Sequence, residues 1–257
     1  AWKKFGDSAD YFPAQRTQNP PELKNKEIYF IDFTYSAEIT KKFIAENKKV
    51  IIIDHHITAK ETSELVSDKL FDINHSGAVL AWKYFHPKIK LPKLLEHVED
   101  MDLWRFKVPK SKEIISYLDT VDFSFKNWDE TAKGMGNKLK HAEYLNEGAA
   151  ILKYQDQLIE RIISNHAVKV NFFGYKTYAV NSPVFNSQIA NILNNSLPPI
   201  GIVWSQGNDG SIHVSLRSNG AVDVSMLAAK FKGGGGHKRS AGFSIENSSK
   251  LPWKKIK

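Results

Sequence analysis

The sequence predicts an α/β protein, with an N-terminal domain built on a parallel sheet, a helical connector and a smaller C-terminal mixed α/β domain. Two short apolar runs, Glu27–Phe33 and Lys48–Asp54, flank a helical pattern. A long stripe of apolar residues with helical spacing then runs from Ala142 to about His166. Beyond it the chain changes to alternating strands, a hairpin turn and a run of glycines. We therefore expect domains at residues 1–141 and 168–257, joined by a connector at 142–167.

The two apolar runs are predicted to form neighbouring strands of the parallel sheet. Each is apolar on both faces, which is typical of a strand covered by helices on either side. Between them, Ser36 is placed to cap a helix that carries Ile39 and Phe43 on one face. Such a βαβ unit binds ligands beyond the carboxyl ends of its strands. Asp32 and the segment Asp54–His56 stand at those two ends.

The rest of the chain shows the patterns of further helices and of a hairpin. One helical pattern ends at Pro87, and the next leads into the acidic stretch "VEDMDLW". Near the C-terminus, polar residues at 213, 215 and 217 alternate with apolar residues, so one face of that strand is predicted to be polar. The expected elements are helices at 76–87, 91–106, 182–199 and 222–231, a strand at 175–180 and a hairpin at 200–218.

The polar residues at the strand ends form a candidate metal site. Asp32, His55, His56 and one acid of the stretch 98–104 would supply carboxylate and imidazole ligands, and the chain contains no cysteine. Such ligands suit Mn²⁺, Mg²⁺ or Fe. A single Asp-His-His tripeptide is more often a cap or a buried hydrogen-bonded group. Its pairing with Asp32 at the neighbouring strand end favours a metal site.

The glycine run Gly233–Gly236, followed by His237, is a second candidate site. A flexible linker or a helix C-cap is the simpler explanation, but one glycine suffices for a cap. Four in a row indicate that backbone approaches a ligand closely, and its N–H groups can hold phosphate oxygens. His237 and Arg217 would add hydrogen bonds and positive charge.

The charge balance is compatible with an anionic substrate. The formal net charge is +8, which attracts phosphates but is equally typical of a lysine-rich surface. The lysines are scattered along the chain, which argues against a dedicated duplex-binding motif. The sequence shows neither an apolar run long enough to span a membrane nor a signal peptide, so by default we expect a cytoplasmic protein without a membrane partner.

In this order, "IDF", "VIIIDHH", "SGAVLAWKYF", "VEDMDLWRF", "VSLRS" and "FKGGGGHKRSAGF" resemble the DHH phosphoesterase superfamily. More narrowly, they resemble its members with a glycine-rich DHH-associated C-terminal domain, such as the bacterial oligoribonucleases (nanoRNases). The resemblance implies a DHH catalytic domain at 1–141 and a DHH-associated substrate-binding domain at 168–257. It also implies two Mn²⁺ ions, with Mg²⁺ or another divalent ion as the alternative.

The resemblance also assigns roles to residues. It makes Asp32, His55 and Asp100 metal ligands, with Asp102 as the less favoured alternative to Asp100. It places His56 at the scissile phosphate, with Asp54 orienting the histidines. The residues that it assigns to substrate binding are Arg217, Gly234, Gly235, Gly236 and His237.

The implied function is that of a metal-dependent phosphodiesterase that hydrolyses short 5′-phosphorylated oligonucleotides or dinucleotides with a metal-activated hydroxide. Exopolyphosphatase and single-strand exonuclease activities of the same superfamily are alternatives, and a homodimer stays open. The family's first motif, an Asp-containing loop with further metal ligands, is expected immediately before Ala1, and we attribute its absence to truncation. If the motif is absent from the natural protein, the alternative is a nucleotide-binding protein without turnover.

Overall fold

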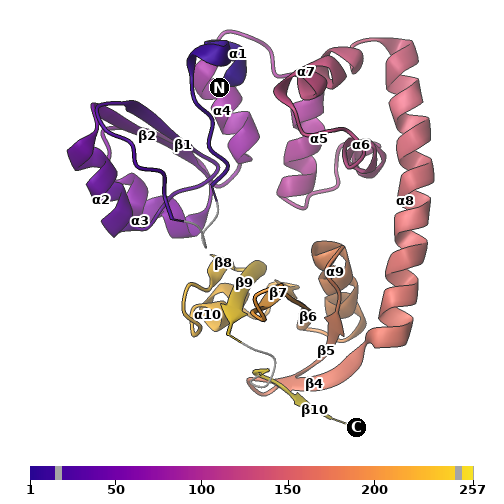
Figure 1. Ribbon diagram of the computed structural model, residues 1–257. Helices are drawn as coiled ribbons and strands as arrows, with labels where there is room; N and C mark the ends of the chain where they lie inside the picture. The colour runs from indigo at the N-terminus through magenta and orange to yellow at the C-terminus, as the bar shows by residue number, and fades with distance from the viewer. Residues whose placement is uncertain (15–18, 247–250, 257) are drawn as a thin grey trace. The chain divides into compact units, whose positions relative to one another are not determined.

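The computed structural model describes residues 1–14, 19–246 and 251–256. The chain forms two compact units, Ala1–Tyr154 and Gln155–Lys257, and the boundary between them lies within the long helix α8 (Lys138–His166; Figure 1). The sequence predicts a helix over most of this stretch, and the helix is present. The domain boundaries at 141 and 167 stay a prediction.

The first unit contains a parallel sheet with the strand order β1-β2-β3, formed by Glu27–Ile31, Lys49–Asp54 and Asp68–Phe71. The predicted βαβ unit is confirmed, because α2 (Ala37–Glu46) connects β1 to β2 and the Ser36 hydroxyl accepts from the Ile39 N–H at 3.4 Å. The strand that carries Asp-His-His is central, so its isoleucines are buried on both faces of the sheet.

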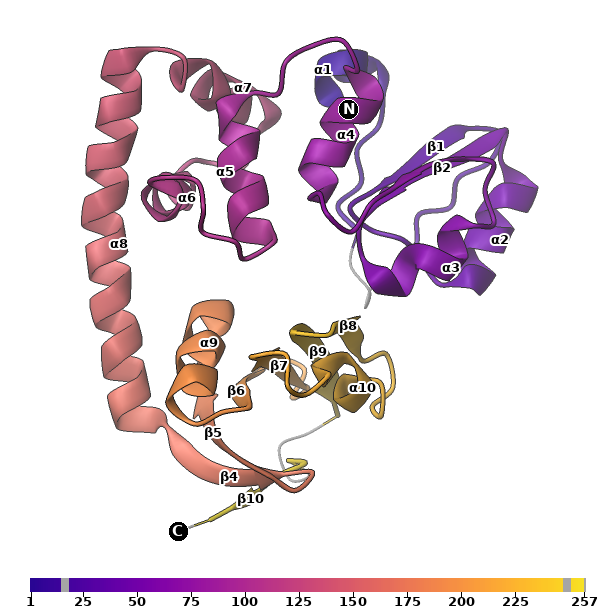
Figure 2. The same ribbon diagram turned by 180° about the vertical axis from the view of Figure 1, so that it is seen from behind.

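Helices cover this sheet on both faces. On one face Phe43 of α2 packs on Ile52, and on the other Leu80 and Phe85 of α4 pack on Ile51 and Ile53. A further cluster joins α5, α6 and the first half of α8 (Figures 1 and 2). The remaining helices of the unit are α1 (Trp2–Phe5), η1 (Gly6–Ser8), η2 (Ile57–Ala59), α3 (Lys60–Ser63), α4 (Gly77–Phe85), α5 (Lys93–Asp102), α6 (Ser111–Leu118) and α7 (Phe125–Gly134).

The second unit is built on a mixed sheet with the strand order β10-β4-β5-β6-β7-β9-β8. The predicted hairpin is present as β6 and β7, whereas β4 and β10 were not predicted from the sequence. The helix α9 connects β5 to β6, which are parallel. The elements are β4 (Val168–Phe172), β5 (Tyr175–Asn181), α9 (Asn186–Ser196), β6 (Ile200–Gln206), β7 (Ile212–Ser218), α10 (Val224–Ala228), β8 (Gly235–His237), β9 (Ser240–Ile245) and β10 (Lys254–Lys255).

The two faces of this second sheet differ in character. One face is apolar, and Leu216 and Phe243 lie there in a cluster with Leu227 of α10. The opposite face is covered by α9 over Val180 and Val203. On that same face, β7 and β9 present their alternate polar residues, as the sequence predicts for β7. Among the residues that the structure describes, none of the helices combines the length and the apolar character needed to cross a membrane.

Candidate metal centre

The ends of β1 and β2 bring Asp32 and Asp54 side by side. The two strands pair in register, with Ile31 opposite Ile53, and the Asp32 N–H extends the ladder by donating to the Ile53 carbonyl at 2.9 Å. Asp32 itself has a left-handed backbone (φ 56°), a conformation that Asp and Asn adopt at lower cost than most other residues with a side chain. The chain therefore turns directly at the residue that carries the carboxylate.

Asp32 and the two histidines form a cluster of ligand atoms. The Nε2 atom of His55 lies 3.1 Å from Asp32 Oδ1, and Nδ1 of His56 lies 4.0 Å from the same oxygen. One donor atom from each of the three residues lies within 4.8 Å of the other two. Two imidazoles and a carboxylate, all without sulfur, match the donors that Mn²⁺ and similar divalent ions accept. The described residues at these strand ends therefore fit a metal ion.

Asp54 organises the turn that carries the histidines. Its carboxylate is fully buried, and Oδ1 accepts from the backbone N–H groups of His55 and His56 at 2.7 and 3.0 Å. The same oxygen lies 2.7 Å from His56 Nδ1, and Oδ2 accepts from the Thr34 hydroxyl at 2.6 Å. Burial disfavours the charged carboxylate, but these hydrogen bonds outweigh burial and lower the pKa of Asp54. A charged carboxylate accepts, so the His56 proton lies on Nδ1.

Asp102, in the last turn of α5, also reaches this cluster. Its Oδ2 lies 3.6 Å from His55 Nε2. Burial, together with the negative charge of Asp32, raises the pKa of Asp102. For His55, burial lowers the pKa, but the hydrogen bond to Asp32 and the charges of both carboxylates outweigh burial, and the pKa is raised. Because these carboxylates surround one buried imidazole, a positive charge is stabilised at this position.

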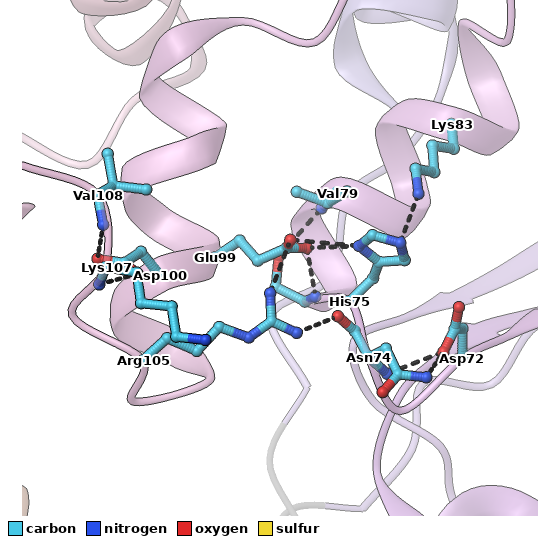
Figure 3. Close-up of polar contacts among 11 residues, drawn as sticks. Asp72, Asn74, His75, Val79, Lys83, Glu99, Asp100, Arg105, Lys107 and Val108 are labelled. Carbon is cyan, nitrogen blue, oxygen red and sulfur yellow. Dashed lines mark hydrogen bonds and ion pairs between the residues drawn. The ribbon is translucent and has the colours of Figure 1, made fainter.

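Asp100, the acid that sequence reasoning favoured as a ligand, is held elsewhere. Its buried carboxylate accepts from the backbone N–H groups of Lys107 and Val108 at 2.7 and 3.2 Å (Figure 3). The acidic stretch that was predicted to be a turn is the end of α5. Asp100 and Asp102 are two residues apart, and such residues point to nearly opposite sides of a helix. Asp100 thus binds the loop after the helix, whereas Asp102 lies beside His55.

Gly77, which sequence reasoning missed, sets the space available to Asp32. A Cβ atom built on Gly77 would lie 2.3 Å from the Asp32 carboxylate, far inside van der Waals contact. Gly77 opens α4, directly after Ser76, whose hydroxyl caps the helix by accepting from the Val79 N–H at 3.2 Å. The sequence does contain a sign that Gly77 has a special role. Glycine has a low helix propensity, yet it stands at the first position of a well-capped helix.

The predicted substrate-binding residues Arg217 and His237 lie in the second unit. Arg217 of β7 is opposite Ser240 of β9, which is opposite His237 of β8. Residues opposite one another in antiparallel strands project from the same face, so these three side chains form one row. Arg217 donates to the Ser187 hydroxyl of α9 at 2.6 Å. The second unit therefore presents a polar row with a guanidinium and an imidazole.

The glycines of the predicted phosphate loop have structural reasons within the chain itself. A Cβ on Gly234 would lie 2.0 Å from the carbonyl oxygen of Ala228, so α10 packs directly on this backbone. Gly236 has φ +143°, and its Cβ would meet the Ser240 carbonyl oxygen at 2.5 Å. Gly235 and Gly236 also pair with β9 as part of β8. Close packing explains two of these glycines, and their phosphate-binding role stays a prediction.

A comparison with protein families identifies a domain in the second unit. Residues 170–253 match the DHHA1 domain model, which covers most of the second unit. The Asp54–His55–His56 motif stands at the end of the central strand of the first unit. The second unit contains a DHHA1 domain. A glycine-rich DHH-associated C-terminal domain was expected from the sequence, and this match confirms it.

Proteins similar to this chain come from a virus and from bacteria. An uncharacterized protein of Acanthamoeba polyphaga mimivirus is 30% identical over 245 residues, which are 91% of this chain and 57% of the relative. The chain thus spans little more than half of that protein. A 3′,5′-cyclic-nucleotide phosphodiesterase of Helicobacter pylori is 22% identical over 78% of this chain and 69% of its own length. A solved exopolyphosphatase-related protein from Bacteroides fragilis has a TM-score of 0.43 at 17% identity, covering 86% of this chain and 67% of its own.

Proposed function

We propose that this chain is a metal-dependent phosphodiesterase that hydrolyses short 5′-phosphorylated oligonucleotides or dinucleotides. The observation that carries the proposal is the cluster of Asp32, His55, His56 and Asp102 at the ends of β1 and β2 and the end of α5. Its donors suit a divalent ion, and the H. pylori relative named as a phosphodiesterase supports a phosphorus–oxygen bond as the target. The resemblance to DHH phosphoesterases agrees with this reaction class.

Asp32, His55 and Asp102 would hold Mn²⁺, with Mg²⁺ as the alternative. A divalent ion supplies two things when bound: it lowers the pKa of water and it neutralises charge that develops on phosphate oxygens. Asp102 replaces Asp100 in this proposed ligand set because Asp102 Oδ2 lies 3.6 Å from His55 Nε2, whereas the Asp100 carboxylate accepts from the backbone after α5.

The protein's own contribution is to orient His56. Asp54 holds the His56 ring through Nδ1, which fixes both the ring plane and the tautomer. With Nδ1 bonded to Asp54, Nε2 is the atom at which His56 would exchange a proton with the substrate. An imidazole in this fixed state can accept or deliver a proton at Nε2 during phosphodiester cleavage.

The polar row of the second unit would bind a phosphate group of the substrate. Arg217 supplies a planar guanidinium suited to two phosphate oxygens, and His237 supplies a further donor on the same face of the sheet. Backbone N–H groups of Gly234 to Gly236 would complete this anchor. A phosphate anchor of this kind favours substrates with a terminal 5′-phosphate.

The test is an assay of the full-length natural protein with Mn²⁺. The substrates are 5′-phospho-dinucleotides, 3′,5′-cyclic nucleotides, a cyclic dinucleotide, polyphosphate and longer single strands. We expect hydrolysis of the dinucleotides with the highest kcat/KM. Preference for polyphosphate or long strands would assign the exopolyphosphatase or exonuclease alternative instead. Nucleotide binding without hydrolysis of any of these would leave the non-catalytic alternative.

Two variants separate the proposed roles in this assay. His56→Ala removes a proton-transferring group, so kcat is expected to fall by about 10²–10⁴-fold. Arg217→Lys keeps the charge but loses the planar fork, so KM for 5′-phosphorylated dinucleotides is expected to rise while kcat changes less. Wild-type turnover by His56→Ala would contradict the assignment of this site.

A further inference from the structure

Glu99 of α5 is the centre of a hydrogen-bonded network next to the metal centre (Figure 3). Its Oε2 accepts from the backbone N–H of Ser76 at 2.9 Å and lies 3.0 Å from Nδ1 of His75. Its Oε1 accepts from Arg105 Nη1 at 3.4 Å. The Glu99 side chain is only 13% exposed, so these contacts are largely shielded from water.

The donors around Glu99 have defined directions. Lys83 can only donate, and its ammonium lies 2.7 Å from Nε2 of His75, so that nitrogen accepts. The proton of a neutral His75 ring is then on Nδ1, which donates to Glu99. Arg105 donates with its other amino group to the backbone carbonyl of Asn74. One carboxylate thus ties the segment 74–76 to the end of α5.

One of the two segments that Glu99 joins carries a carboxylate of the metal centre, and the other lies next to a residue that packs against one. Asp102 follows Glu99 by three residues and lies on the same side of α5, one turn further along. On the other segment, Gly77 follows Ser76 directly, and the Asp32 carboxylate packs against Gly77. Asp102 and Asp32 lie 3.6 and 3.1 Å from the same atom, Nε2 of His55.

We propose that Glu99, supported by Arg105 and His75, is a positioning residue that sets the relative placement of the Asp32 and Asp102 carboxylates. This inference rests on the proposed function, because it concerns the same metal centre. Glu99 acts by locking the N-terminus of α4 to the C-terminus of α5. It remains a hydrogen-bond acceptor from the protein and is not itself a metal ligand.

Glu99→Gln is the sharpest variant for this proposal. Glutamine keeps the size and one acceptor oxygen, but it turns an amide NH₂ toward donors that need an acceptor. The lock is then weakened without a cavity. Substitution of residues that hold metal ligands in place typically weakens metal affinity by about 10–100-fold. We expect the Mn²⁺ dissociation constant of Glu99→Gln to rise about 10-fold.

The matched control is Glu96→Gln. Glu96 lies one turn earlier on α5, is exposed, and loses the same charge when substituted. Isothermal titration of the metal-free proteins with MnCl₂ compares the two variants with wild type. We expect Glu96→Gln to bind with the wild-type dissociation constant. Equal affinities of Glu99→Gln and wild type would overturn the proposal.

A crystal structure of metal-free Glu99→Gln gives a readout that does not depend on metal binding. We expect Asp102 Oδ2 to move away from His55 Nε2, beyond the 3.6 Å of the wild type. If both distances to His55 stay unchanged, Glu99 does not position the carboxylates. If the wild-type protein binds no Mn²⁺, the proposed function fails, while this structure still decides whether Glu99 has the positioning role.

A second variant covers the case in which Glu99→Gln does not fold. Arg105→Gln leaves Glu99 bonded to His75 and Ser76 but removes the link to Asn74. We expect it to raise the Mn²⁺ dissociation constant by a smaller factor than Glu99→Gln, about 3-fold, within the range of a lost net hydrogen bond. Wild-type affinity in this variant would contradict the part assigned to Arg105.

Discussion

The carboxylate of Asp54 lies 2.7 Å from Nδ1 of His56, and the side chain of Asp54 is fully buried. The same oxygen accepts from two backbone N–H groups, so one atom fixes both the turn and the imidazole. This arrangement places the two histidines in different surroundings. His55 faces the carboxylates, and His56 is oriented by the strand that carries it.

Asp54→Asn tests whether the Asp54 carboxylate orients His56. Asparagine can keep the acceptor at the position of Oδ1 and place its NH₂ toward the Thr34 hydroxyl, so the turn is retained and only the charge is lost. We expect kcat for a 5′-phospho-dinucleotide to fall about 10–100-fold. Thr34→Val, which removes only the hydroxyl, is the control and should cost less. Unchanged kcat in Asp54→Asn would show that the charge does not orient His56 for turnover.

Asp100 and Asp102 are expected to respond differently to the same substitution. Asp102→Asn removes a carboxylate from the cluster, so Mn²⁺ affinity should fall at least about 10-fold, with little effect on unfolding. Asp100→Asn weakens two buried hydrogen bonds to backbone N–H groups and should lower the free energy of unfolding by about 1–3 kcal/mol. Titration calorimetry and urea unfolding measure the two effects. The reverse pattern would restore Asp100 as the ligand.

Gly77→Ala tests the space that glycine leaves for Asp32. The added methyl would lie 2.3 Å from the carboxylate, so Asp32 must move. We expect a loss of Mn²⁺ affinity of about 10-fold, although no ligand is removed. Gly136→Ala is the control, because the nearest atom to its Cβ is 3.3 Å away. Titration with Mn²⁺ compares them, and equal affinities would show that Asp32 adapts without cost.

Gly234→Ala tests the structural explanation of the glycine run. The new Cβ would lie 2.0 Å from the Ala228 carbonyl oxygen, a backbone atom that moves only with α10. We expect the free energy of unfolding of the second unit to fall by about 1–3 kcal/mol. Urea unfolding followed by the fluorescence of Trp204 and Trp253 measures it. A variant with the wild-type midpoint but weaker substrate binding would assign Gly234 to the phosphate site alone.

His97 gives a pH dependence of stability. Its buried ring lies 3.0 Å from the Ser111 hydroxyl, and burial lowers its pKa below the unfolded value of 6.5. Below pH 6.5 the unfolded chain therefore binds a proton that the folded chain resists, and stability falls as the pH falls. His97→Gln should reduce this acid-side loss in thermal unfolding between pH 7.5 and 5. The exposed His166→Gln is the control, and identical pH profiles of wild type and His97→Gln would contradict the prediction.

The βαβ unit of the first unit could be predicted because its signals are local. The central strand reads as a buried apolar run, and the polar residues Asp32, His55 and His56 follow strand ends directly. Parallel strands of a βαβ unit end at the same edge, so their meeting follows from topology alone.

The choice between Asp100 and Asp102 could not be predicted in the same way. Both acids lie in the last turn of α5, and the one that faces β2 depends on how the helix is rotated against the sheet. That rotation is set by packing of Leu94 with residues of α6, which are distant in sequence. The Glu99 network has the same origin, since the partners of Glu99 come from the segment before α4 and from the loop after α5.

The glycine run shows a different kind of difficulty. A glycine that is needed for the close approach of a ligand cannot be distinguished in a sequence from a glycine that is needed for the close approach of a backbone carbonyl of the same chain. Only the position of α10 on Gly234 shows that the second reason applies there. The short strands β4 and β10 were missed because strand pairing between distant segments has a weak local signal.

The left-handed backbone of Asp32 has a consequence for how this protein can change over evolutionary time. Glutamate is the closest chemical substitute for aspartate, but it would bear the conformational penalty of that backbone and carry its carboxylate one carbon further. Asparagine and glycine suit the turn but cannot supply the charge. Asparagine and glycine are therefore the substitutions that position 32 tolerates most easily. Either one would remove the carboxylate and leave the fold intact.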